Sequence, residues 1–176
     1  MDTSPPPRSP ADELVMIVDR DNTPIGAAPR HRMRAENLIH RASYIFVFNT
    51  ERALFIQRRT LTKDIYPGYW DTAAGGVMLA AESEIESARR ELAEELGVTD
   101  TLLTFCFHNY FETATNRVWG AIYRCHHDGP FILQEEEVSE GMFMPVAEVL
   151  RRSALEPFTP DGIEILHKLR QQGLAD

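Results

Sequence analysis

The length, composition and charge of the chain limit both its architecture and its partners. With 176 residues, 43% hydrophobic and 26% charged, the composition is that of one soluble globular domain, which excludes a disordered or fibrous protein. The formal net charge of −9 disfavours nucleic-acid polymers and anionic membranes as partners, because both are polyanions. A small phosphorylated ligand would need local cations or metal ions.

Targeting and cysteine signals are absent from the sequence. The N-terminal residues lack the basic and then apolar order of a secretory signal, and no apolar run approaches the length of a membrane helix. Cys106 and Cys125 have no zinc or redox spacing, which favours reduced, buried thiols. We therefore expect a cytoplasmic protein. The apolar pattern identifies no oligomer interface.

The N-terminal part is predicted to contain a tail, a hairpin and a weak helix. Residues 1–11 are rich in proline and small polar residues, which predicts a flexible tail before a single domain over 12–176. The apolar run at 14–18 and the turn residues at 19–22 predict a short hairpin. Residues 31–39 have a weak helical pattern.

Two strands and a long loop are predicted next. Residues 43–48 and 53–57 are apolar runs around a turn, and we expect them to pair antiparallel. Residues 61–76 contain four proline or glycine residues and are predicted to form a loop. Beyond the following helix, the pattern predicts strands at 102–111, 118–125 and 131–133 and helices at 146–152 and 161–172. This alternation predicts an α/β sandwich, with helices on both faces of a mixed sheet.

The helix between these regions has clear start and stop signals. Ser83 and Glu86 fit a capping box, and Gly97 is placed to adopt the left-handed conformation that ends a helix. The apolar residues between them fall on one stripe that would pack against the sheet, namely Ile85, Ala88, Leu92 and Leu96.

Three glutamates lie beside that stripe. Glu91, Glu94 and Glu95 are spaced i, i+3 and i+4, which places their carboxylates on one edge of the helix. Such like charges repel one another, and a divalent cation with hard oxygen preference would relieve the repulsion. Three glutamates alone, however, more often mark a solvated helix face.

The complete motif changes this balance. It runs Gly76-x5-Glu82-x7-Arg90-Glu91-Leu92-x-Glu94-Glu95-x-Gly97-Val98 and matches every defining position of the Nudix signature. The chain therefore resembles the Nudix hydrolase superfamily over roughly residues 13–174. The resemblance implies a Nudix-type α/β/α sandwich with a mixed sheet. It also implies that Gly75, Glu91, Glu94 and Glu95 bind Mg²⁺ or Mn²⁺, that Arg90 orients the carboxylates, and that Gly76, Glu82 and Gly97 support the box.

The implied reaction is metal-dependent cleavage of a diphosphate, with release of a monophosphate. A bound divalent ion lowers the pKa of water and neutralises charge that develops on phosphate. The general base is expected to be a helix glutamate, Glu91 or Glu94, or a residue of the acidic run at 135–140, where Glu137 and Glu140 are candidates.

A cationic segment before the box supplies candidates for substrate binding. Arg58, Arg59, Lys63 and Trp70 lie in a stretch that resembles the branch containing isopentenyl-diphosphate isomerase. Because strand side chains alternate, only one of the two arginines is expected to face the pocket. Trp70 would stack on a base or pack in the core.

The isomerase reaction is disfavoured, because the catalytic cysteine of that branch aligns with Ala74 and its metal-binding histidine aligns with Gly76. We therefore expect a hydrolase of nucleoside di- or triphosphates or related nucleoside diphosphate compounds. The alternatives are an isomerase-like enzyme and a noncatalytic nucleotide-binding regulator.

Overall fold

The computed structural model describes residues 9–175. Most of the predicted tail lies outside this range, but its end is structured, because Pro10–Asp12 form a short 3-10 helix (η1) capped by the Ser9 side chain. No helix within the described range is long and apolar enough to cross a membrane. Cys125 is buried and Cys106 half-buried, and both are free thiols.

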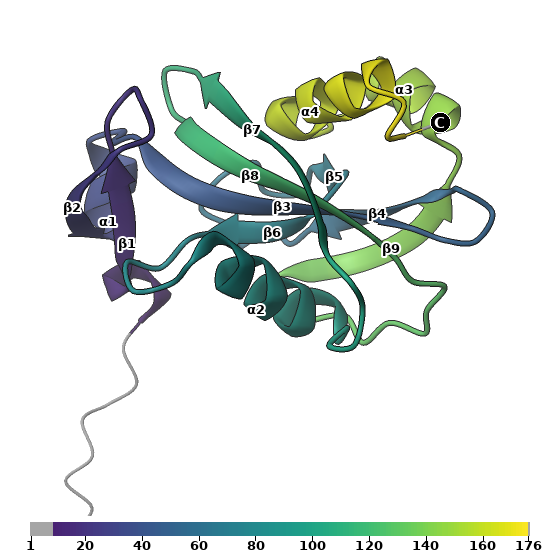
Figure 1. Ribbon diagram of the computed structural model, residues 1–176, viewed down its shortest axis with the longest axis horizontal. Helices are drawn as coiled ribbons and strands as arrows, with labels where there is room; N and C mark the ends of the chain where they lie inside the picture. Colours follow the sequence, from purple (N-terminus) through teal and green to yellow (C-terminus); the bar gives the residue numbers. More distant parts are fainter. Residues whose placement is uncertain (1–8, 176) are drawn as a thin grey trace, which may run out of the picture.

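The described residues form one curled mixed sheet that is centred on β3 (His40–Phe48) (Figure 1). This strand pairs in parallel with β8 (Arg117–His126) and antiparallel with β6 (Ala74–Val77). The predicted hairpin is present as β1 (Leu14–Val18) and β2 (Pro24–Pro29). The remaining strands are β4 (Leu54–Arg59), β5 (Trp70–Asp71), β7 (Thr104–Glu112) and β9 (Val138–Met144).

Helices cover both faces of the sheet, as the sequence predicted (Figure 1). On β3, Phe46 and Phe48 pack in the same core cluster as residues of α3 (Val146–Ser153) and α4 (Pro160–Gln171). The alternate residues Ile45 and Val47 pack with the apolar stripe of α2 (Glu84–Leu96) on the opposite face. Because side chains alternate along a strand, β3 contributes to the cores on both faces of the sheet. The weak helix is α1 (Arg30–Ala35).

The two central strands pair antiparallel as predicted, at Phe48 and Leu54, beyond which β3 pairs with β6 and β8 while β4 pairs with β9. Two other predicted features need correction. The predicted loop at 61–76 ends in two short strands, β5 and β6. Residues 131–133 form no strand; Phe131 and Leu133 instead pack against the α2 core. The strand in that region is β9, which begins inside the acidic run.

The start of α2 is held by the predicted capping box. The Ser83 hydroxyl accepts a hydrogen bond from the Glu86 backbone at 3.3 Å, and the Glu86 carboxylate accepts one from the Ser83 backbone at 2.8 Å. At the other end, Gly97 has a φ of 68°, the left-handed conformation expected of the cap. The helix that carries the glutamates is therefore fixed at both ends.

Replacing Ser83 with alanine is expected to lower the free energy of unfolding by about 1 kcal/mol, because the amide of Glu86 loses its cap. Urea denaturation measures this change. Ser83→Asp is the matched control, since an aspartate oxygen accepts the same hydrogen bond and should retain most of the stability. Equal losses of stability in both variants would show that the capping hydrogen bond is not the cause of the loss.

Candidate active site

Arg90 lies at the centre of the box and binds three of its glutamates. Its guanidinium pairs with Glu82 and donates to Glu91 at 2.8 Å and to Glu94 at 3.2 Å. Glu82 in turn accepts a hydrogen bond from the Leu79 backbone. Burial alone would lower the pKa of Arg90, but the hydrogen bond to Glu82 and the charge of Glu91 outweigh it and raise that pKa. Arg90 therefore stays charged and fixes the positions of the carboxylates.

Glu95 and Glu91 point inward from α2. Glu95 is buried and accepts hydrogen bonds from the Gln57 side chain at 2.7 Å and the Gly75 backbone at 3.2 Å. Burial, followed by the charge of Glu91, raises the pKa of Glu95 to about 8. Burial also raises the pKa of Glu91, against the opposing effect of Arg90. Two adjacent carboxyl groups are thus held in a place where ionising both of them is unfavourable.

Glu94 lies at the exposed side of this pair and shares the Arg90 guanidinium with Glu91. Its side chain is 48% exposed and contacts Arg90. Across residues 9–175, no three acidic, histidine or cysteine side chains are gathered closely enough to form a metal cage. The three glutamates thus share one edge of the helix, but among the described residues they do not form a complete set of ligands without the metal. Gly76 leaves room for the inward pair, since a Cβ there would lie 2.7 Å from a Glu91 carboxylate oxygen.

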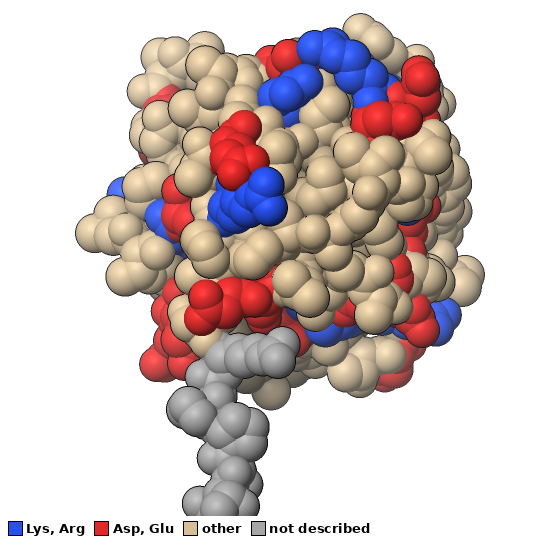
Figure 2. Space-filling view, turned by 90° about the vertical axis from the view of Figure 1, so that its left-hand side faces the viewer, with Lys and Arg blue, Asp and Glu red and all other residues tan. Residues whose placement is uncertain are grey.

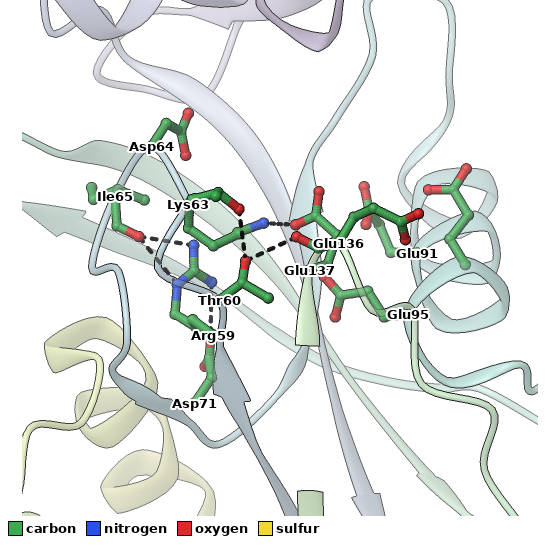
Figure 3. Close-up of polar contacts among 12 residues, drawn as sticks. Arg59, Thr60, Lys63, Asp64, Ile65, Asp71, Glu91, Glu95, Glu136 and Glu137 are labelled. Atoms are coloured by element: carbon green, nitrogen blue, oxygen red, sulfur yellow. Dashed lines mark hydrogen bonds and ion pairs between the residues drawn. The ribbon is translucent and has the colours of Figure 1, made fainter. Parts of the chain in front are cut away.

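The acidic run contributes one residue to this region. Gln134 donates its backbone N–H to the Glu95 carbonyl at 3.0 Å, which ties the run to the end of α2. Glu137 then forms an ion pair with Lys63, and Figure 3 shows this pair beside Glu91 and Glu95. We call Glu91, Glu95 and Glu137 the acidic cluster. Glu140 lies elsewhere, paired with Arg58 at 3.3 Å.

A cleft opens beside the acidic cluster, between the sheet and the loop over 60–68. It is bounded on one side by Gly75 and Gly76. Four cations line it, namely Arg30, Arg34, Arg59 and Lys63. Its other polar and aromatic walls include His40, Tyr44, Tyr66, Asn116 and Asp161.

Two residues predicted to bind substrate lie outside the cleft. Arg58 alternates with Arg59 along β4 and points to the opposite side, where it pairs with Glu140. Trp70 is 6% exposed and stacks on Phe158 in the core. We therefore leave both out of the proposed site. The arginines of α1 were not predicted, because only the fold brings Arg30 and Arg34 to the cleft, where both bind Asp64.

Most cations around the cleft are already paired with acids. On the molecular face that carries α1 and the β1–β2 hairpin, basic and acidic side chains lie in small interspersed groups (Figure 2). Arg59 donates to Asp71 at 3.1 Å and to the Ile65 carbonyl, which fixes the loop (Figure 3). This pairing agrees with a small anionic ligand better than with a long polyanion.

The raised pKa of Glu95 predicts a pH-dependent stability in the absence of metal. A carboxyl group whose pKa rises from 4.5 to about 8 on folding holds its proton more tightly in the folded protein. The stability that protonated Glu95 contributes to the folded protein is complete below pH 4.5 and is lost as the pH rises to 8. Glu95→Gln stays neutral at every pH. In EDTA, we expect the difference in free energy of unfolding between this variant and the wild type to change by about 2 kcal/mol or more, in favour of the variant, as the pH rises from 5 to 8. Urea denaturation at both values tests this, and parallel pH profiles would contradict it.

The family assignment rests on comparisons of sequence and structure. The protein-family model of the NUDIX domain matches residues 38–169 of the sequence. The chain is 42% identical over 154 residues to an uncharacterized Nudix hydrolase of Pseudomonas aeruginosa, PA4841, covering 88% of this chain and 91% of that protein. It is 45% identical over 161 residues to the uncharacterized Nudix hydrolase YfcD of Escherichia coli K12, covering 90% and 87%.

Solved structures show the same fold at lower identity. DR0079 from Deinococcus radiodurans superimposes with a TM-score of 0.78 at 24% identity, covering 89% of this chain and 98% of that one. The NUDIX domain of Shewanella oneidensis NrtR, solved in complex with ADP ribose, gives 0.58 at 19% identity, covering 76% and 86%. Together with the intact box on α2, these matches establish that the chain belongs to the Nudix hydrolase family, whose members act on phosphoric anhydrides.

Proposed function

We propose that this protein is a divalent-metal-dependent pyrophosphohydrolase. Its substrate would be a nucleoside di- or triphosphate or a related nucleoside diphosphate compound, and one product would be a monophosphate. The observation that carries the proposal is the juxtaposition of the buried Glu95 and the partly buried Glu91 of α2 with a cleft lined by four cations. Carboxylates that attract a metal and cations that attract phosphate thus meet at one place.

The donor set fits Mg²⁺ or Mn²⁺. Glu91, Glu94, Glu95 and the carbonyl of Gly75 would hold the ion, since both metals prefer hard oxygen ligands. Burial raises the pKa of both Glu91 and Glu95, so a bound cation would favour the ionised form of each carboxyl group. When bound, the ion would supply charge neutralisation at the phosphate and a water of lowered pKa.

The residues of the chain would position the reactants. Arg90 holds Glu91 and Glu94 in place through its two hydrogen bonds. Arg59 and Lys63 face the cleft and are suited to phosphate oxygens, one as a planar fork and one as a point charge. Glu137 would be the residue of the acidic run that accepts a proton from the attacking water, since it lies beside Glu91 and Glu95, whereas Glu140 pairs with Arg58.

The part of the cleft lined by aromatic side chains would hold the nucleoside. Tyr44 and Tyr66 offer aromatic surface there, and His40 and Asn116 offer polar groups. Burial lowers the pKa of His40 to about 3, so this imidazole stays neutral at physiological pH. The fold shared with the ADP-ribose complex of NrtR adds support for a nucleoside diphosphate compound as ligand.

A substrate panel tests the proposal. Nucleoside di- and triphosphates, ADP-ribose and isopentenyl diphosphate would be incubated with the protein and Mg²⁺ or Mn²⁺, and the products separated by ion-exchange chromatography. We expect a nucleoside monophosphate from at least one nucleotide, and none in EDTA. Isomerisation of isopentenyl diphosphate without hydrolysis, or nucleotide binding without turnover, would contradict the proposal.

A further inference from the structure

Lys63 is a sheltered cation at the acidic cluster. Its side chain is 11% exposed, and its ammonium group donates to the Glu137 carboxylate. Glu137 lies beside Glu91 and Glu95, so the ammonium group is next to the whole cluster. Figure 3 shows Lys63 extending from its loop toward these carboxylates.

The loops that carry the two partners are anchored. Thr60 donates its backbone N–H to the Glu137 carbonyl at 3.1 Å, which joins the Lys63 loop to the acidic run. Asp64, the next residue after Lys63, accepts from Arg30 at 3.2 Å and from Arg34 at 3.0 Å. The backbones are therefore fixed, while the long side chain of Lys63 keeps the freedom to change its partner.

The other cation near the glutamates has no such freedom. Arg90 is held by a bidentate ion pair with Glu82 and by its hydrogen bond to Glu94. Arg90 also faces Glu82, near the start of the box. Lys63 instead lines the cleft in which a diphosphate would bind. Lys63 is thus the cation that faces both the acidic cluster and the cleft.

We infer that Lys63 is an exchangeable counter-ion. In the metal-free protein its ammonium group balances Glu91, Glu95 and Glu137, and in the metal-bound protein it moves to the diphosphate and leaves the Glu137 carboxylate free. This inference rests on the proposed function. A divalent ion beside Glu91 and Glu95 repels the ammonium group, and the diphosphate offers it a new anionic partner. Lys63 is then a positioning residue that couples metal binding to substrate binding.

The inference predicts opposite effects on metal and on diphosphate. Loss of the ammonium group removes its repulsion of a divalent ion at the neighbouring carboxylates, so metal binding should tighten. Loss of the same group removes a partner of the diphosphate, so diphosphate binding should weaken. A side chain that only supports the fold would weaken both.

The test compares Lys63→Met with the wild type. Mn²⁺ binding without substrate is measured by electron paramagnetic resonance at pH 8, and binding of methylenediphosphonate, a non-hydrolysable diphosphate, by calorimetry at saturating Mn²⁺. For Lys63→Met we expect the Kd for Mn²⁺ to fall about tenfold and the Kd for methylenediphosphonate to rise about tenfold. Lys63→Arg retains the charge and should leave both constants close to the wild-type values.

Lys168→Met is the matched control, because the chain has two lysines and Lys168 lies on α4, paired with Glu164. It should alter neither constant. A Kd for Mn²⁺ that is unchanged or higher in Lys63→Met overturns the inference but leaves the proposed function standing. Unchanged binding of methylenediphosphonate overturns it as well. Failure of the wild-type protein to bind Mn²⁺ overturns both the inference and the proposed function.

Discussion

Replacing Glu94 with glutamine is expected to reduce kcat by about 100-fold or more, because a carboxamide retains the shape of the side chain but binds a hard divalent cation poorly. The fold should be unaffected, since Glu94 is half-exposed and contacts Arg90 at the surface of α2. Steady-state hydrolysis of the best substrate at saturating Mg²⁺ measures the loss. Urea denaturation of the same variant should give a free energy of unfolding within about 0.5 kcal/mol of the wild type.

Glu84→Gln provides the matched control for this substitution. It makes the same chemical change on the same helix, but Glu84 pairs with His108 at 2.9 Å and is not a defining position of the box. Its activity should remain near the wild-type level. If Glu94→Gln retained the turnover of Glu84→Gln, Glu94 would have no part in metal binding or catalysis.

Replacing Gly75 with alanine is expected to lower the free energy of unfolding by about 3 kcal/mol or more. A Cβ at this position would lie 1.9 Å from the Ser43 carbonyl oxygen, a backbone atom of the paired strand that cannot move alone. The φ of 144° adds strain for any residue with a side chain. Denaturation in urea, monitored by circular dichroism, measures the loss.

Gly26→Ala separates the steric clash from the backbone strain. Gly26 has a similar φ of 156°, but a Cβ there meets no atom within 4 Å. This variant should lose only about 1 kcal/mol. Equal destabilisation at the two positions would mean that the close approach of β6 to β3 is not what requires glycine.

Local signals explain what could be predicted of the fold. Ser83, Glu86 and Gly97 act on neighbouring backbone groups, so the ends of α2 follow from sequence alone. β9 was missed because it is polar at several positions, Ser139 and Glu140 among them, and takes its hydrogen bonds from β4. β6 was hidden by its two glycines, which break a strand pattern but here allow close pairing with β3.

The same distinction holds for the candidate site. The box predicted the placement of Glu91, Glu94 and Glu95 along one helix, because helical spacing is local. Gln57, which binds Glu95, and the arginines of α1 were missed, because only the tertiary fold brings them there. Alternation along β4 did indicate that Arg58 and Arg59 face opposite ways, but Trp70 gave no signal to separate stacking on a ligand from burial in the core.

The central claim is that the glutamates of α2 bind the divalent ion that diphosphate cleavage requires. Titrating the isotope-labelled protein with Mg²⁺ and following its amide and side-chain carboxyl resonances by NMR tests this claim most directly. We predict saturable shifts centred on Gly75, Glu91, Glu94 and Glu95, with a midpoint that matches the Mg²⁺ dependence of hydrolysis. Shifts confined to other parts of the molecule, while hydrolysis still requires Mg²⁺, would contradict it.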